Sequence, residues 1–100
     1  MMKKATTKKT GATGKKRITF ELVAEPGIEV FVAGTFNNWD VTGKKLADKN
    51  GDGNYRGVVM LSPGAYEYKF YVDNIWCVDP ANPNFTQNEL GTLNSVLVVE

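Results

Sequence analysis

The sequence contains no histidine and only one cysteine, Cys77. Without histidine, a Ser-His-Asp or Cys-His catalytic arrangement is impossible, and the ligand cluster that zinc sites usually need is missing. A lone cysteine also excludes an internal disulfide, which is typical of a reducing compartment. Cys77 itself is expected to be a small packed hydrophobe. We therefore predict a cytoplasmic protein that is not an enzyme and needs no metal or other cofactor.

Long apolar runs and a sustained helical period are also missing. No stretch reaches the length needed to span a membrane, and the charged first residues have no apolar segment after them, so a secretory signal is not expected. Apolar residues alternate with polar ones in short segments separated by Gly, Pro, Asn and Asp. This pattern predicts an all-β fold, an antiparallel β-sandwich of six to eight short strands. The expected strands are residues 18–24, 28–33, 44–47, 55–61, 65–72, 75–78 and 95–99, with a loop over 79–89.

Acidic residues are absent from the first seventeen positions, although the net charge of the whole chain is only +1. Residues 1–17 hold seven of the twelve basic residues, so residues 18–100 hold five basic and eleven acidic residues, a net charge of −6. We predict that residues 1–16 form a disordered basic tail and that residues 17–100 form the domain. The tail can contact nucleic acid or acidic surfaces, or it can be a solubilising leader or cloning remnant. The negative charge of the domain argues against nucleic acid as a partner.

A hairpin is expected where Asp73 and Asn74 join two alternating segments, since both residues tolerate positive φ. This two-residue loop places Val72 opposite Ile75, Tyr71 opposite Trp76 and Phe70 opposite Cys77. Directly opposite residues project to the same face of a sheet. The core side then carries Phe70, Val72, Ile75 and Cys77, and the outer side carries Lys69, Tyr71 and Trp76.

A second tryptophan lies in an unusual setting. Residues 34–40 read Gly-Thr-Phe-Asn-Asn-Trp-Asp directly after an apolar strand. Loops run over the surface because their backbone groups need water, so Trp39 is expected to be held towards solvent while Phe36 anchors inward. Residues 48–53 read Asp-Lys-Asn-Gly-Asp-Gly and copy the first half of a calcium loop. The bidentate Glu that such a loop needs at its twelfth position is replaced by Val59, so we interpret this segment as a turn.

Two tryptophans off the core, with a lysine and several asparagines, suit a non-catalytic sugar site. An indole has a flat apolar face that can stack on the C–H face of a pyranose while Lys and Asn bond its hydroxyls. The same rings can stack nucleobases, but phosphate binding needs a positive groove. The remaining alternative is that one or both tryptophans fill the core. The hairpin register opposes this for Trp76, and the Asn-rich setting opposes it less firmly for Trp39.

Four motifs in a fixed order resemble the family 48 carbohydrate-binding modules, and among them the glycogen-binding domains of AMP-activated protein kinase β subunits. These motifs are residues 34–39, the run Leu-Ser-Pro-Gly-Ala-Tyr-Glu-Tyr-Lys-Phe-Tyr-Val-Asp at 61–73, Trp76 with Asp-Pro at 79–80, and Leu-Gly-Thr-Leu-Asn at 90–94. The resemblance implies an immunoglobulin-like, early-set sandwich that binds α-1,4-linked glucans such as glycogen, starch and malto-oligosaccharides. It implies stacking by Trp39 and Trp76, hydrogen bonds from Lys69 and Asn94, and lining contacts from Leu90 and Thr92.

An alternative from another class is open at this point. Early-set domains also serve as structural or docking modules, and the exposed tryptophans would then be interface anchors. The partner in that case would be a glycogen-metabolising enzyme or a kinase, without sugar binding by this chain.

Overall fold

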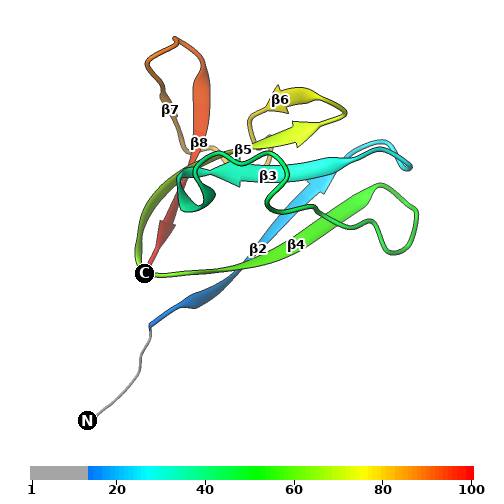
Figure 1. Cartoon of the computed structure of the whole chain (residues 1–100), viewed down its shortest axis with the longest axis horizontal. Helices are drawn as coiled ribbons and strands as arrows, with labels where there is room; N and C mark the ends of the chain where they lie inside the picture. Colours follow the sequence, from blue (N-terminus) through cyan, green and yellow to red (C-terminus); the bar gives the residue numbers. More distant parts are fainter. Residues whose placement is uncertain (1–13) are drawn as a thin grey trace.

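A computed structural model describes residues 14–100 of the chain. The predicted disordered tail, residues 1–16, lies almost entirely outside the described residues. Within 14–100 the chain forms seven β-strands and one short 3₁₀ turn, η1 (Figure 1). They are β2 (Lys16–Val23), β3 (Val30–Gly34), η1 (Thr35–Asn37), β4 (Asn54–Leu61), β5 (Gly64–Val72), β6 (Ile75–Cys77), β7 (Phe85–Gln87) and β8 (Leu93–Val99). The predicted all-β fold is confirmed.

The strands form two antiparallel sheets of unequal size. β2 pairs with β4 in a two-stranded sheet, and the second sheet has the order β3-β5-β8-β7, with β6 paired to β5. β3 pairs with one edge of β5. The other edge is shared by two strands: β8 pairs with its first part, up to the pair Tyr68–Ser95, and β6 pairs with its last part, from the pair Phe70–Cys77. Figure 1 shows β2 and β4 passing across β3 and β5 as a separate layer. The result is a sandwich with a narrow sheet on a wide one.

The core lies between these two sheets. Phe20 and Leu22 from β2 meet Val32 from β3 and Phe70 from β5, and all four side chains are buried. Alternating residues of a strand project to opposite faces, and these four residues occupy the inward set of their strands. Phe36 from η1 stacks on Phe20 with a centroid distance of 5.7 Å. The expected inward anchor is therefore confirmed.

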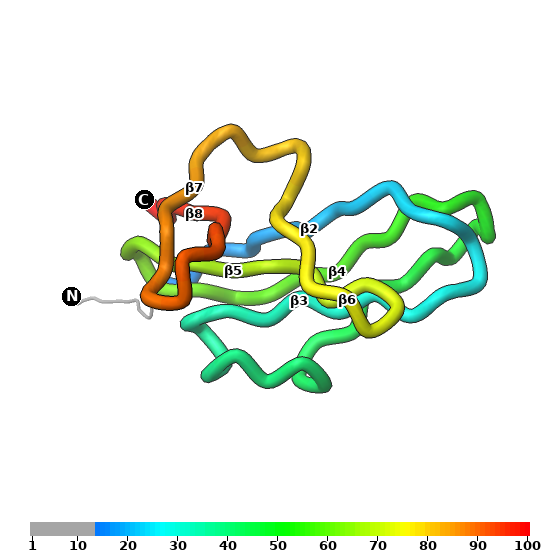
Figure 2. The backbone as a smooth tube through the Cα atoms, turned by 90° about the horizontal axis from the view of Figure 1, so that it is seen from above, coloured from blue at the N-terminus to red at the C-terminus, as the bar shows by residue number. Residues whose placement is uncertain are grey.

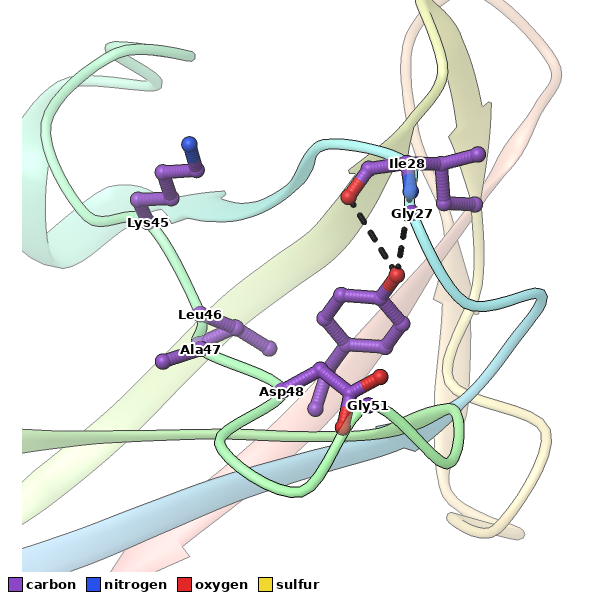
Figure 3. Close-up of a pocket in the computed structure, with 8 residues that line it drawn as sticks. Gly27, Ile28, Lys45, Leu46, Ala47, Asp48 and Gly51 are labelled. Atoms are coloured by element: carbon purple, nitrogen blue, oxygen red, sulfur yellow. Dashed lines mark hydrogen bonds between the residues drawn. The ribbon is translucent and has the colours of Figure 1, made fainter.

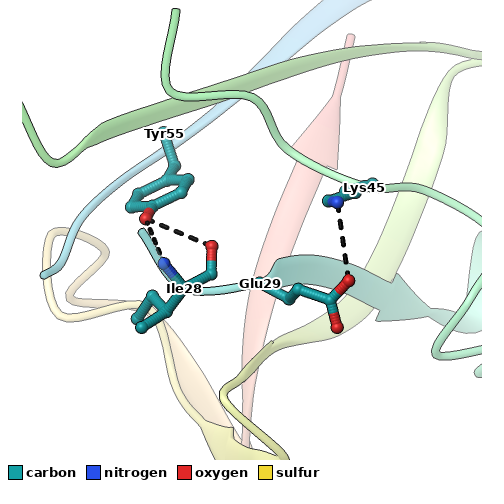
Figure 4. A network of polar contacts seen from close by, with 4 residues as sticks. All are labelled: Ile28, Glu29, Lys45 and Tyr55. Carbon is teal, nitrogen blue, oxygen red and sulfur yellow. Dashed lines mark hydrogen bonds and ion pairs between the residues drawn. The ribbon is translucent and has the colours of Figure 1, made fainter. Parts of the chain in front are cut away.

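Residues 44–47 join the two sheets along one side. Lys45 bridges to Phe31 of β3, and Ala47 bridges to Arg56 of β4. The expected short strand is thus a crossing segment with isolated bridges to each sheet. Beside it, the hydroxyl of Tyr55 accepts a hydrogen bond from Ile28 N at 3.2 Å (Figure 4). The same hydroxyl donates to the carbonyl oxygen of Glu25 at 2.8 Å. This tyrosine ties the segment that precedes β3 to β4.

The β5–β6 hairpin has the predicted register. Tyr71 pairs with Trp76 and Val72 pairs with Ile75, and the turn residues Asp73 and Asn74 have φ of 48° and 67°. One part of the prediction is wrong, because Ile75 is 64% exposed and does not join the core. Cys77 is only half-buried. The reason is geometric: both residues point to the inner side, but the two-stranded β2–β4 sheet is too narrow to cover β6.

The segment 79–89, expected to be a loop, contains β7. Figure 2 shows the connection from β6 to β7 arching away from the body of the sandwich. Its base is tied to the core by Tyr68, whose hydroxyl donates to Asp79 Oδ2 at 2.7 Å and accepts from Asn82 Nδ2 at 3.0 Å. Burial is the main cause that raises the pKa of Tyr68 above its ordinary value of 10.0. Among the described residues, no helix is long and apolar enough to cross a membrane.

Candidate functional site

The loop over residues 34–40 is built around two close contacts. Gly34 lies against β5, and a Cβ added there would collide with the carbonyl oxygen of Glu67 and with the ring of Phe36. The side chain of Asn37 turns back and its Oδ1 accepts from Gly34 N at 3.0 Å. Trp39 N then donates to Gly34 O at 2.9 Å. The loop is therefore a closed turn, and only glycine fits at its first residue, Gly34.

Trp39 leaves this turn in a left-handed backbone conformation. Asn38 has φ 58° and Trp39 has φ 59°. Asparagine tolerates this region, but a bulky residue there is a true outlier and carries a cost of about 1–2 kcal/mol. Strained residues of this kind cluster at functional sites, because the surrounding structure must maintain them for a purpose other than stability. The backbone thus marks Trp39 independently of its side chain.

The two tryptophans lie side by side. The ring centroids of Trp39 and Trp76 are 6.2 Å apart, with an interplanar angle of 72°. The ring centroids of Tyr71 and Trp76 are 4.9 Å apart, with an interplanar angle of 56°. Trp39 is half-buried, and Trp76 is 43% exposed. The three rings form a cluster on the outer face of the sheet, and neither tryptophan belongs to the core.

Polar side chains continue this surface along β5. Lys69 shares the outer face with Tyr71, two residues away, and its Nζ donates to Thr92 Oγ1 at 3.1 Å. Thr92 belongs to the turn between β7 and β8, where Leu90 is 88% exposed. Asn94 is only 6% exposed, and its Nδ2 donates to Glu67 Oε1 at 2.9 Å. The fold therefore brings the ring cluster, Lys69 and Thr92 onto one face, with Asn94 beneath them.

Asn88 organises the turn between β7 and β8, and sequence reasoning missed it. Its Oδ1 accepts from the backbone N–H of Leu90 and of Thr92, at 3.0 and 3.1 Å. Its Nδ2 donates to Thr92 Oγ1 at 2.7 Å and to Asn94 Oδ1 at 3.1 Å. An asparagine shortly before a glycine is a general turn signal, but nothing in the sequence indicates which four atoms this amide meets.

Comparison with known proteins assigns the chain to a family. A family profile described as the glycogen recognition site of AMP-activated protein kinase matches residues 17–100. The chain belongs to this glycogen-recognition family. It is 38% identical over 74 residues to 5'-AMP-activated protein kinase subunit beta-1 of Rattus norvegicus. This aligned stretch covers 74% of this chain and 26% of the relative. It is 35% identical over 88 residues to the beta-2 subunit of Homo sapiens, covering 88% and 31%. The chain thus spans between a quarter and a third of the length of these relatives.

In this member of the glycogen-recognition family, a hollow lined by residues 27–28, 45–48, 51 and 55 lies away from the tryptophans. It has a volume of about 610 Å³, and Tyr55 is among its lining residues. Figure 3 shows Lys45 and Asp48 at its wall. These groups already have partners: Lys45 pairs with Glu29 at 3.5 Å (Figure 4), and Asp48 Oδ2 accepts from Gly53 N at 2.7 Å. The hollow therefore offers few free polar groups to a ligand.

The carboxylates of the half calcium loop cap backbone groups. Asp48 Oδ1 accepts from Asp52 N at 3.1 Å, and Asp52 Oδ1 accepts from Asn54 N at 3.1 Å. The turn interpretation is thus confirmed. The hydrogen bonds from Asn54 hold the pKa of Asp52 below its usual range, and those from Thr42 do the same for Asp40. A general acid needs the opposite shift. In the part of the chain that the structure describes, no group of three potential metal ligands occurs.

Proposed function

We propose that this chain binds α-1,4-linked glucans such as glycogen, starch and malto-oligosaccharides. Trp39 and Trp76 stack on sugar rings, Lys69 and Thr92 bond sugar oxygens, and Leu90 supplies apolar contact. The observation that carries the proposal is the pair of neighbouring tryptophans, 6.2 Å apart between centroids, on the same face as Lys69. The hydrogen bond proposed for Asn94 comes from the resemblance alone. Burial of Asn94 supports a second role for it, which is to hold the turn through Glu67 and Asn88.

The angle between the two indoles supports a curved ligand. Their planes meet at 72°, so they cannot both lie flat on two sugar rings that share one plane. Successive rings in an α-1,4 chain are inclined because the chain coils, whereas a β-1,4 chain is a flat ribbon. An α-glucan can therefore present one face to each indole. Two stacks of roughly 1–3 kcal/mol each, offset by association costs, give an expected Kd of about micromolar to millimolar for short oligomers.

Several observations support a binding role without catalysis. The chain has no histidine, and the lowered pKa values of Asp40 and Asp52 are unsuited to proton donation. The relatives are named as kinase subunits, and this chain matches only part of each. We therefore propose a kinase or a glycogen-metabolising enzyme as the class of protein partner. A cytoplasmic location also stays a prediction, resting on the single cysteine.

A titration tests the proposal directly. Maltoheptaose and β-cyclodextrin are added to the chain while tryptophan fluorescence is followed, and cellohexaose serves as the flat-ribbon control. We expect saturable changes with the two α-glucans and none with cellohexaose. Trp76→Ala should lose at least tenfold in affinity, since one stack is removed. Phe85→Ala removes an aromatic ring that is 58% exposed on β7 but lies outside the proposed site, so it should bind like wild type.

The alternative docking function gives a different result. If the tryptophans are interface anchors for a protein, fluorescence will not change with any glucan up to several millimolar, and Trp76→Ala will be indistinguishable from wild type. That result would sink the glucan proposal. Equal binding of maltoheptaose and cellohexaose would instead leave sugar binding in place and refute the argument from the ring angle.

A further inference from the structure

The hydroxyl of Thr92 has an unusual set of neighbours for an exposed side chain. Lys69 Nζ donates to its oxygen at 3.1 Å, and Asn88 Nδ2 donates to the same oxygen at 2.7 Å. A hydroxyl has two acceptor lone pairs and one O–H donor. Both lone pairs are therefore engaged, and the O–H proton is the only hydrogen-bonding function that Thr92 has left.

The direction of these bonds is set by backbone groups. Asn88 Oδ1 accepts from Leu90 N and Thr92 N, and backbone N–H groups can only donate. The amide of Asn88 is therefore oriented with its NH₂ towards Thr92 and Asn94. Lysine has three donors and no acceptor, so Lys69 also can only donate to Thr92. Neither neighbour can reverse its role without breaking a backbone bond or deprotonating Lys69.

We propose that Asn88 is a positioning residue that makes Thr92 a hydrogen-bond donor to the ligand. This inference rests on the proposed glucan binding and adds the polarity of one contact, namely which partner donates the hydrogen bond between Thr92 and the sugar. Thr92 offers its O–H, and the Nζ of Lys69 has two N–H groups left after its bond to Thr92. This edge of the site therefore presents donors, so the sugar oxygen that meets it acts as an acceptor. A group that can only donate is not accommodated there.

Modified sugars test this polarity without altering the protein. Methyl maltotriosides in which one hydroxyl at a time is replaced by hydrogen or by fluorine are titrated against the full chain. Fluorine can accept a hydrogen bond weakly but cannot donate one. At the hydroxyl that meets Thr92, we expect the deoxy sugar to bind about three- to tenfold more weakly than the parent, the loss of one hydrogen bond. The fluoro sugar should recover at least half of that loss on a logarithmic scale.

Variants assign the effect to the two residues. Thr92→Val removes the O–H and should abolish the difference between fluoro and deoxy sugars, whereas Thr92→Ser should keep it. Asn88→Asp keeps the acceptor for the two backbone N–H groups but turns a donor towards Thr92 into an acceptor. The threonine proton then bonds the introduced carboxylate, and the same difference should disappear. Asn82→Asp is the matched control, because Asn82 also donates twice through Nδ2, to Tyr68 and Val96, away from the site.

The outcomes separate this inference from the function on which it rests. If the parent maltotrioside does not bind, both are overturned. If it binds but no fluoro sugar exceeds its deoxy counterpart, or if the difference persists in Thr92→Val or in Asn88→Asp, the polarity is refuted while glucan binding stands. The comparison of fluoro and deoxy sugars on the wild-type chain decides the polarity even if Asn88→Asp does not fold.

Discussion

The left-handed backbone of Trp39 gives a prediction in which stability and binding separate. Replacing Trp39 by Ala or by Gly removes the indole in both cases, so both variants should lose glucan binding to the same extent. Ala keeps the cost of φ near 59°, about 1–2 kcal/mol, and Gly does not. Gly also gains conformational freedom in the unfolded chain, which offsets about 0.4–1 kcal/mol of that stability advantage over Ala. We expect Trp39→Gly to be slightly more stable than Trp39→Ala.

The matched comparison is the same pair of changes at Trp76. This residue is not among those with positive φ, and it lies in a strand, where Gly is less stable than Ala by roughly 0.5–1 kcal/mol. Subtracting the Gly–Ala difference at position 76 from that at position 39 cancels the unfolded-state contribution. What remains is the left-handed penalty of about 1–2 kcal/mol.

Thermal and urea unfolding of the four variants measure this quantity. For a domain of this size, 1 kcal/mol corresponds to roughly 4–8 °C in Tm, so the expected difference is well resolved. The reasoning is refuted if the double difference is smaller than about 0.4 kcal/mol, the usual scatter of additivity. The backbone at Trp39 would then be relaxed, and its value as a marker of function would be lost.

Three further predictions follow from the packing. Gly34→Ala should destabilise the fold in urea unfolding by about 1–3 kcal/mol, because the new Cβ collides with the Glu67 carbonyl. Gly27→Ala meets no atom within 4 Å but lies at φ 84°, so it measures backbone strain alone and is the comparison that isolates the collision. Measured by calorimetry, Tyr71→Phe should bind maltoheptaose like wild type, whereas Tyr71→Ala should weaken the affinity about two- to tenfold because an aromatic pair is lost. An equal loss of affinity in both variants would assign the role to the hydroxyl instead of the ring. The pKa of Tyr68 is raised on folding, so the contribution of Tyr68 to stability is complete below pH 10.0 and is lost as the pH rises towards the folded pKa. In urea unfolding at several alkaline pH values, Tyr68→Phe should lose less stability with rising pH than wild type, and an equal loss would contradict the reasoning.

The sequence predicted the strands and one register well because those features follow from local rules. The period of two predicted the segments that form β2 and β5, and the Asp73–Asn74 turn was enough to place Phe70 on the core side and Tyr71 opposite Trp76. It failed where the answer depended on the width of the opposing sheet. Ile75 has the correct face for a core residue, but no strand of the β2–β4 sheet extends far enough to cover it.

The candidate site was predictable as a set of residues but not as a geometry. Local sequence indicated that Trp39 and Trp76 leave the core, and their proximity came only from the family resemblance. Asn88 was missed because its role consists of four bonds to atoms that the chain brings together only after β7 and β8 pair. The buried state of Asn94 was missed for the same reason, since Glu67 reaches it from β5 and Asn88 reaches it from the turn between β7 and β8.

The shared edge of β5 has a mechanical consequence. β8 and β6 occupy successive parts of that edge, so Trp76 sits on a three-residue strand whose ladder, among the described residues, is formed with β5 alone. Trp39 sits on a different element, closed by its own turn. A sugar chain that contacts both rings would act as a direct tie between two segments that, among the described residues, are joined by backbone hydrogen bonds only through β5. Amide exchange in β6 would then report occupancy from within the protein, without any label on the glucan.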